Sequence, residues 1–180
     1  MSIKFELTAE SVTVFGVKLF RIRCVTSFGD VKAGDTGGFV ERVENVDQAG
    51  NAWVYGDAQV SGNARVYGNA RVYGDARVYG DARVYGDARV YGNARVYGNA
   101  RVYGDARVEK MTDIFFAGPL GSRKSQITAF RCEVGFKVST GCFLGTADEF
   151  INRVIDVHKD NDHARLYNSF IEICNYIYKE

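Results

Sequence analysis

Arginine recurs at every sixth position through the middle of this 180-residue chain, and its guanidinium group is the first candidate for chemistry. The repeated arginines are Arg65, Arg71, Arg77, Arg83, Arg89, Arg95, Arg101 and Arg107. A guanidinium group is planar and permanently charged, and it can donate two parallel hydrogen bonds to a phosphate or a carboxylate. An array of such groups on one surface therefore predicts binding of an anionic ligand.

Aromatic residues interleave with these arginines, because each repeat also holds a tyrosine at a fixed place. The aromatic candidates for ligand contacts are Tyr67, Tyr73, Tyr79, Tyr85 and Trp53, the last of which occupies an arginine position. Aromatic and arginine side chains are the types that most often anchor binding interfaces. Three interpretations of the array stay open, namely neutralisation by acids of the repeat, cation–π contact with the tyrosines, and an external anion.

Histidine is the usual general base at neutral pH, and the chain has only His158 and His163. Both come after the repeats, so the sequence predicts no catalytic residue in the array. Asp160 and Asp162 lie close to them, but the spacing matches no metal-binding motif. We therefore expect no metal site and take the two histidines as solvated residues of a turn between helices.

A second candidate for anion binding is the segment 118–125, which contains Ser122 and Arg123. Its glycines could let backbone N–H groups approach a phosphate, but the segment lacks the Gly-Lys-Ser/Thr ending of a P-loop. A plain turn is the alternative interpretation.

A hexapeptide repeat positions the arginines and tyrosines. Residues 50–109 read Gly-Asn/Asp-Ala-x-Val-Tyr ten times with little variation. Ala and Val lie two apart, as on one face of a strand, and Gly-Asn/Asp is typical of a turn. Three such units per coil, with coils stacked about 4.8 Å apart, would bury every Ala and Val inside a triangular prism. The sequence therefore predicts a mainly β protein with a parallel β-helix, a hexapeptide-repeat solenoid, over residues 50–117.

Residues eighteen apart should then stack on one face of the solenoid. One face would carry Trp53, Arg71, Arg89 and Arg107, a second Gln59, Arg77 and Arg95, and the third Arg65, Arg83 and Arg101. Like charges opposite one another on neighbouring strands repel, so each column needs a compensating partner.

Both flanks are predicted to cap the solenoid, whose end strands would otherwise expose unpaired edges. Residues 1–49 should form an N-terminal β cap, with a hairpin that turns at Phe15-Gly16 and a first irregular rung in which Val46 takes the Ala position. Residues 118–180 should form a C-terminal α+β cap. It would hold a β-hairpin of residues 127–132 and 136–144 and two helices, the first opened by a capping box at Thr146.

Between these regions, Thr112 and Ile114 would fill the Ala and Val positions of a last degenerate repeat.

The four cysteines are Cys24, Cys132, Cys142 and Cys174. They form no Cys-x-x-Cys pair, and we expect them to be buried and reduced.

Charge and hydropathy limit the partners. The chain holds 23 Lys and Arg against 22 Asp and Glu, which gives no basic field for nucleic acid, and we expect no sequence-specific nucleic-acid partner. No apolar run is long enough to span a bilayer, and the N-terminal residues lack the apolar core of a signal peptide. We expect no membrane partner and a cytoplasmic location.

Four motifs in one order resemble a family of phage and prophage hexapeptide-repeat proteins that are often labelled transferases. The motifs are residues 28–41, the repeat itself, Gly121-Ser122-Arg123 and residues 141–150. The resemblance implies a left-handed β-helix, a phage origin, action in the host cell cytoplasm, and a side-by-side homotrimer with Trp53 and strips of Arg and Tyr at the subunit grooves. Hexapeptide acyltransferases, which the coil also resembles, use a histidine on the coil and acetyl-coenzyme A, and this coil has no histidine.

We therefore expect a non-catalytic binding protein with no cofactor. Its expected partners are a second and third copy of the chain, an anionic small molecule such as a nucleotide, or a host defence protein. A phage counter-defence protein that sequesters a nucleotide-type signal is the concrete form of this hypothesis. An acetyl-coenzyme A-dependent acyltransferase and a structural virion or scaffold protein are the alternatives.

Overall fold

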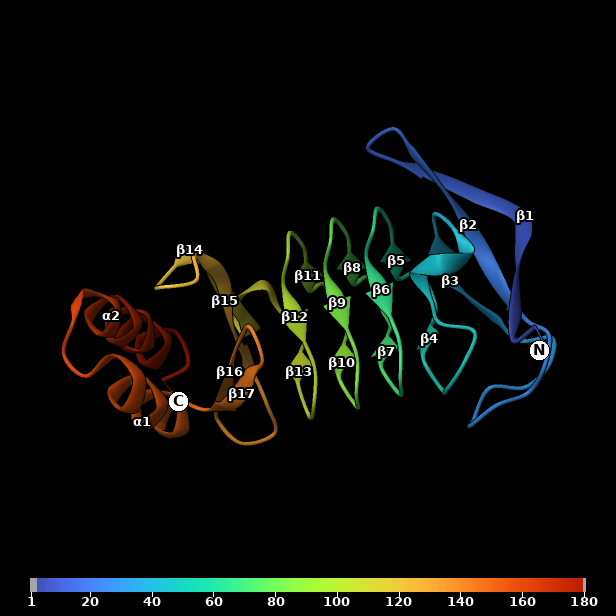
Figure 1. The fold of residues 1–180 in the computed structure, drawn as a ribbon. Coiled ribbons are helices and arrows are strands. Elements are labelled where there is room, and N and C mark those ends of the chain that lie inside the picture. The colour runs from blue at the N-terminus through green and yellow to red at the C-terminus, as the bar shows by residue number, and fades with distance from the viewer. Residues whose placement is uncertain (1–2, 180) are drawn as a thin grey trace.

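The computed structural model describes residues 3–179 (Figure 1). An N-terminal β cap, a parallel β-solenoid and a C-terminal cap of strands and helices follow one another along one axis. This arrangement confirms the mainly β class and the predicted solenoid, while the left-handed winding stays a prediction. No helix among residues 3–179 is long and apolar enough to cross a membrane.

The regular solenoid consists of two-residue strands, each of which holds the x and Val positions of one repeat. They are β4 (Trp53–Val54), β5 (Gln59–Val60), β6 (Arg65–Val66), β7 (Arg71–Val72), β8 (Arg77–Val78), β9 (Arg83–Val84), β10 (Arg89–Val90), β11 (Arg95–Val96), β12 (Arg101–Val102) and β13 (Arg107–Val108). Strands eighteen residues apart pair in parallel, as Val72 does with Val90, and build three sheets along the axis. Every Ala and Val of the repeats, from Ala52 to Val108, is 0% exposed, which confirms the apolar lining.

The corner glycines let the coils approach one another at strand spacing. Gly86 has φ +69°, and a Cβ atom added there would lie 2.9 Å from the backbone nitrogen of Gly104 in the next coil. Any side chain at this corner would strain the backbone and push the coils apart, so the repeat needs glycine at the turn.

The N-terminal cap joins the solenoid without a break. It consists of β1 (Phe5–Val14), β2 (Val17–Cys24), β3 (Thr36–Val40) and the short 3-10 helix η1 (Val43–Asn45). β1, β2 and β3 pair antiparallel in that order, and β3 then pairs in parallel with β5. The stack of rungs therefore begins before residue 50.

Val46 bridges to Val66, so it occupies a Val position rather than the predicted Ala position. The reason is that Val46 and Val54 lie eight residues apart, two more than the repeat provides, and the extra residues shift the alignment.

The hairpin of β1 and β2 extends beyond its partner strand. β2 pairs with β3 only from Phe20 to Arg23, and the part nearer the Phe15-Gly16 turn overhangs the face formed by β5, β8 and β11 (Figure 1). The predicted turn is confirmed, since Val14 and Val17 face each other across it. We call this overhanging part of the hairpin, which lies beside the solenoid, the hairpin arm.

The C-terminal cap is a four-stranded antiparallel sheet with two helices packed on it. Its elements are the 3-10 helix η2 (Met111–Asp113), β14 (Ile114–Leu120), β15 (Ser125–Arg131), β16 (Phe136–Thr140), β17 (Phe143–Thr146), α1 (Ala147–His158) and α2 (Asp162–Ile177). The predicted capping box is confirmed, because the N–H of Glu149 donates to Thr146 Oγ1 and the N–H of Thr146 donates to the Glu149 carboxylate.

Three details of this cap differ from the sequence-based expectations. The predicted single strand 136–144 is broken at Gly141-Cys142, where Gly141 has φ +56°, so a sheet replaces the hairpin. The sheet begins at Ile114, and β14 runs through Gly118-Pro119, a place where an edge strand tolerates proline. Thr112 is exposed and does not line the prism, because η2 lifts it outward, whereas Ile114 is buried.

Candidate functional site

Guanidinium columns run along all three faces of the solenoid, as the repeat predicts. Arg71 pairs with Arg89 and Arg89 with Arg107 on the first face, and Arg77 pairs with Arg95 on the second. On the third face Arg65 pairs with Arg83 and Arg83 with Arg101. The three columns differ in what surrounds them.

The caps cover the two ends of the first face, while Arg89 between them is exposed. Two nitrogens of Arg71 donate to the carboxylate of Asp30 at 3.0 and 2.9 Å, and Arg107 forms an ion pair of 3.1 Å with Glu133. Trp53 is only 1% exposed, since the ring of Phe28 packs against it at 5.5 Å. The prediction that Trp53 contacts a ligand or a subunit groove is therefore wrong, because the N-terminal cap covers it.

The third face carries its own counter-charges. Arg65, Arg83 and Tyr67 line a cavity of about 200 Å³ together with the carboxylates Glu44 and Asp47. Farther along the column, Arg101 donates to the carbonyl of Gly141 at 3.1 Å. The acids in this cavity reduce its attraction for an anion.

The corner tyrosines stack on one another. Ring centroids lie 4.7 Å apart for Tyr67 and Tyr85, 4.6 Å for Tyr85 and Tyr103, 5.0 Å for Tyr73 and Tyr91, and 5.3 Å for Tyr79 and Tyr97. Desolvation in this stack raises the pKa of Tyr85 to about 12, so its hydroxyl stays protonated at neutral pH.

The proposed cation–π contacts inside the repeat are wrong. Among residues 3–179 no arginine of the array lies over a corner tyrosine; Arg77 instead faces Phe15 of the hairpin. The coil spacing places each ring beside its equivalent in the next coil, which leaves its face covered by the neighbouring ring.

The second face and the overhanging hairpin enclose a groove of about 390 Å³, here called the hairpin groove. The hairpin contributes an apolar wall, and β5, β8, β11 and their corners contribute a polar floor. The residues that line it are Val14, Phe15, Val17, Leu19, Gln59, Ser61, Arg77, Val78, Tyr79 and Arg95. Of the predicted ligand residues, Arg77, Tyr79 and Arg95 are thus brought together, whereas Tyr73 and Arg89 lie on the first face and its corner.

The hairpin groove differs from the other two faces in electrostatics. None of its lining residues is a carboxylate, and this sets it apart. Arg77 and Arg95 form no ion pair with any residue from 3 to 179, as is also true of Arg65, Arg83, Arg89 and Arg101 on the other faces. The Oε1 atom of Gln59 is buried and has no hydrogen-bond partner among the same residues. A buried acceptor without a partner is costly, and a ligand or water in the groove would remove that cost.

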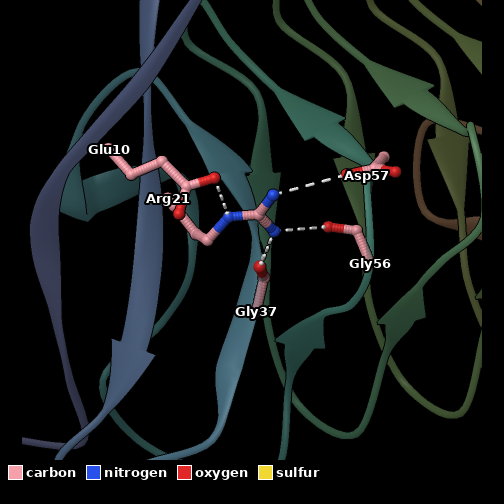
Figure 2. Close-up of polar contacts among 5 residues, drawn as sticks. All are labelled: Glu10, Arg21, Gly37, Gly56 and Asp57. Atoms are coloured by element: carbon pink, nitrogen blue, oxygen red, sulfur yellow. Dashed lines mark hydrogen bonds and ion pairs between the residues drawn. The ribbon is translucent and has the colours of Figure 1, made fainter.

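Arg21 holds the hairpin against the solenoid (Figure 2). One guanidinium nitrogen donates to the carbonyl oxygens of Gly37, at 2.9 Å, and Gly56, at 3.1 Å. The other two nitrogens reach Glu10 of β1 at 2.7 Å and Asp57 of the first corner at 3.4 Å. One side chain therefore ties together β1, β3 and the first regular coil, and fixes the wall of the groove.

The remaining predicted residues lie in the C-terminal cap. Ser122 and Arg123 belong to the turn after β14, away from the hairpin groove. His158 ends α1 and His163 lies in the first turn of α2, with ring centroids 5.6 Å apart. Both are half-buried, so the expectation of solvated turn residues is wrong. No group of three metal-ligating side chains occurs between residues 3 and 179.

A comparison with protein families places the repeat in context. A family model described as the YdcK beta solenoid repeat matches six overlapping stretches, namely residues 58–74, 64–80, 70–86, 76–92, 82–98 and 88–102. The middle of this chain is a β-solenoid repeat. The matched stretches cover about a quarter of the chain and include the strands that carry Arg77 and Arg95 in the solenoid repeat. A search of curated proteins gives no match to this chain.

Several residues of the groove were not identified from the sequence. Phe15 is 91% exposed at the tip of the hairpin. Turns normally hold polar residues, so the phenylalanine in the Phe15-Gly16 turn is the feature of the sequence that indicates a binding surface there. Arg21 and Arg23 lie two residues apart on β2 and therefore on the same face, opposite the buried Ile22, and the sequence does not distinguish which of them reaches the solenoid. Gln59 occupies an arginine position, which marks it as an exception within its column.

Proposed function

We propose that this protein is a non-catalytic binding protein whose hairpin groove holds an anionic, planar small molecule of the nucleotide type. The supporting observation is that Arg77 and Arg95 lie unpaired, within the described residues, opposite an apolar wall. Two guanidinium groups on neighbouring strands, about 4.8 Å apart, can each grip a phosphate group through a planar fork. A volume of about 390 Å³ falls within the usual range of small-molecule sites, about 300–1,000 Å³.

The wall and floor suit different parts of such a ligand. Phe15 and Val17 offer an apolar surface for an aromatic base, and the Arg77 guanidinium lies 5.9 Å from the Phe15 ring. Gln59 Oε1 is itself buried, so the Gln59 side chain would turn toward the groove to accept a hydrogen bond from an amino group of the base. The Tyr79 hydroxyl adds a neutral donor at the edge of the groove.

Isothermal titration of the full chain against a panel of nucleotides tests this proposal. The double variant Arg77→Ala/Arg95→Ala should bind at least about tenfold more weakly, because each charge-assisted hydrogen bond contributes about 1.5–3 kcal/mol. The matched control is Arg83→Ala/Arg89→Ala, which removes the same repeat position from the other two faces and should keep the affinity. Absence of binding across the panel, or equal losses in both variants, would rule the proposal out.

The biological setting is a further part of the proposal. In line with the family resemblance, we propose a phage-encoded protein in the host cytoplasm that sequesters a nucleotide signal of host defence. Side-by-side packing as a homotrimer, in which the exposed Phe15 would meet a neighbouring copy, goes with it. Light scattering measures the molar mass of the purified protein, and the mass of a monomer would exclude the homotrimer.

Other functions have less support. An acyltransferase needs a base near its acyl donor, and both histidines lie in the C-terminal cap rather than beside the groove. A thermal shift with acetyl-coenzyme A would support that alternative. A protein that blocks a host defence protein would co-purify with it and bind no nucleotide. A virion scaffold would co-purify with particles and likewise bind no nucleotide.

A further inference from the structure

A second, smaller cavity lies in the C-terminal cap. The turn after β14, the turn between β16 and β17, and helix α1 meet around a space of about 150 Å³. Since a water molecule occupies about 30 Å³ in the liquid, this space has room for a group as small as a phosphate. We call it the cap pocket.

The cap pocket gathers two arginines and a histidine from distant parts of the sequence. Arg123 of the first turn, Arg153 of α1 and His158 at the end of α1 all line it, and no carboxylate does. Neither arginine forms an ion pair with any residue of the described chain. Both arginines are exposed, so water screens their repulsion, and an anion bound between them would reduce it further.

Hydroxyl groups and apolar side chains, among them Phe150 and Val154, make up the rest of the lining. Ser122, Ser125 and Thr140 lie in the wall, and the side-chain oxygens of Ser125 and Thr140 are 3.4 Å apart. Hydroxyls donate hydrogen bonds to an oxyanion without adding charge. Thr140 Oγ1 donates to the Gln126 carbonyl at 3.3 Å and can accept from Ser125, so Ser122 is the hydroxyl left to donate to an oxyanion beside the two guanidinium groups.

The wall of the pocket is held rigidly from behind. Tyr167 of α2 is buried, and its hydroxyl lies so close to Gly121 that a Cβ atom there would be 1.9 Å from it. Gly121 has φ +67°, which glycine adopts without cost. The turn that carries Ser122 and Arg123 therefore rests on α2 at Gly121, which fixes its backbone there, while both side chains are exposed.

We propose that the cap pocket binds a phosphate-type oxyanion, either free phosphate or the terminal phosphate of a phosphomonoester, through Arg123, Arg153 and His158. This site is independent of the hairpin groove, because it shares no residue with it.

Cys142 supplies a built-in reporter for this site. It lines the cap pocket and is exposed, whereas the other three cysteines are buried, so the expectation that all four are buried is wrong for Cys142. Neutral iodoacetamide should therefore alkylate Cys142 first, and intact-protein mass spectrometry gives the rate. A bound oxyanion shields the thiol and opposes formation of the thiolate, so both effects slow the reaction.

The experiment compares this rate in the full chain with and without inorganic phosphate at constant ionic strength set by chloride. We expect phosphate to slow alkylation severalfold, and Arg153→Ala to abolish this protection. Arg165→Ala is the matched control, since Arg165 lies on the exposed side of α2 beside Asp162 and should leave the protection intact. A parallel series with glycerol phosphate distinguishes the two sources, because stronger protection by it identifies a phosphomonoester.

Thermal unfolding provides a second readout that does not depend on the thiol. Phosphate should raise the melting temperature of Arg77→Ala/Arg95→Ala, whose hairpin groove cannot contribute, with or without Arg165→Ala, and leave it unchanged once Arg153→Ala is added. An unchanged alkylation rate and melting temperature with both anions, or equal effects in Arg153→Ala and wild type, would overturn the proposal. Neither result bears on nucleotide affinity at Arg77 and Arg95, so the two sites succeed or fail separately.

Discussion

At the scale of single residues, the ends of the solenoid need opposite hydrogen-bonding groups. Each coil donates its N–H groups to the carbonyl oxygens of the next coil, as Trp53 does to Ala70. The first coil therefore presents bare carbonyl oxygens, and the last coil presents bare N–H groups. Donors cap the first end, with Lys4 Nζ bound to the Ala52 carbonyl at 2.9 Å, and an acceptor, Gln126 Oε1, caps the other end at Asn99.

The side chain of Lys4 is buried while charged, so the stability of the fold should depend on pH near the pKa of this group. It is 5% exposed, and desolvation lowers its pKa from 10.5 to about 8. The unfolded chain then holds this proton more tightly than the folded one, so the penalty is full below pH 8 and disappears as the pH rises toward 10.5. Relative to Lys4→Met, the wild type should gain up to about 1 kcal/mol of unfolding free energy per pH unit in this window.

Urea unfolding of both proteins between pH 7 and 10 measures that difference. Tyrosines and cysteines titrate in the same range and are common to both proteins. Cys24 interacts with Lys4, so both proteins also carry Cys24→Ser, and the other groups cancel in the comparison. If the unfolding free energies of wild type and Lys4→Met change equally with pH, burial of the charged Lys4 ammonium does not destabilise the fold.

At the scale of elements, the hairpin arm depends on one side chain. Arg21 is largely covered, with 18% of its side chain exposed, and its donors reach four groups on three segments. Lysine has the charge but not the planar set of donors, so Arg21→Lys cannot satisfy Gly37, Gly56 and Glu10 together. We expect a loss of about 1–3 kcal/mol of stability and faster hydrogen exchange in β1 and β2.

Arg23→Lys is the matched control for this prediction. Arg23 lies on the same strand and pairs only with Glu6 at the surface, where an ion pair contributes little. Hydrogen exchange followed by mass spectrometry should show protection of residues 5–24 lost in Arg21→Lys and kept in Arg23→Lys. Equal exchange in the two variants would mean that the arm is held by its backbone pairing alone.

The elements also show where sequence reasoning succeeds and where it fails. The period of six fixed the strands, the turns and the buried Ala and Val, because every rung repeats the same local chemistry. It could not place Trp53, whose burial depends on Phe5 and Phe28 from a cap without a repeat. Nor could it find the two pockets, because Arg77 meets Phe15, and Arg123 meets Arg153, only through tertiary packing.

At the scale of the whole molecule, the solenoid behaves as a one-dimensional stack in which each coil contacts only its neighbours. A repeat can therefore be removed without disturbing either cap. Deletion of residues 81–86 joins Gly80 to Asp87 and keeps the pattern, so each Ala and Val remains inside. Arg101 would take the place of Arg95 beside Arg77, and the C-terminal cap would turn by a third of a coil about the axis.

We expect this six-residue deletion to cost only about 1 kcal/mol of stability, in proportion to the residues lost. Deletion of residues 81–83 is the matched control, because a three-residue gap moves every later Ala and Val out of phase with the coil below. That variant should lose several kcal/mol or fail to fold. Urea unfolding of both variants measures the contrast, and similar stabilities would contradict a stack held together by the six-residue phase.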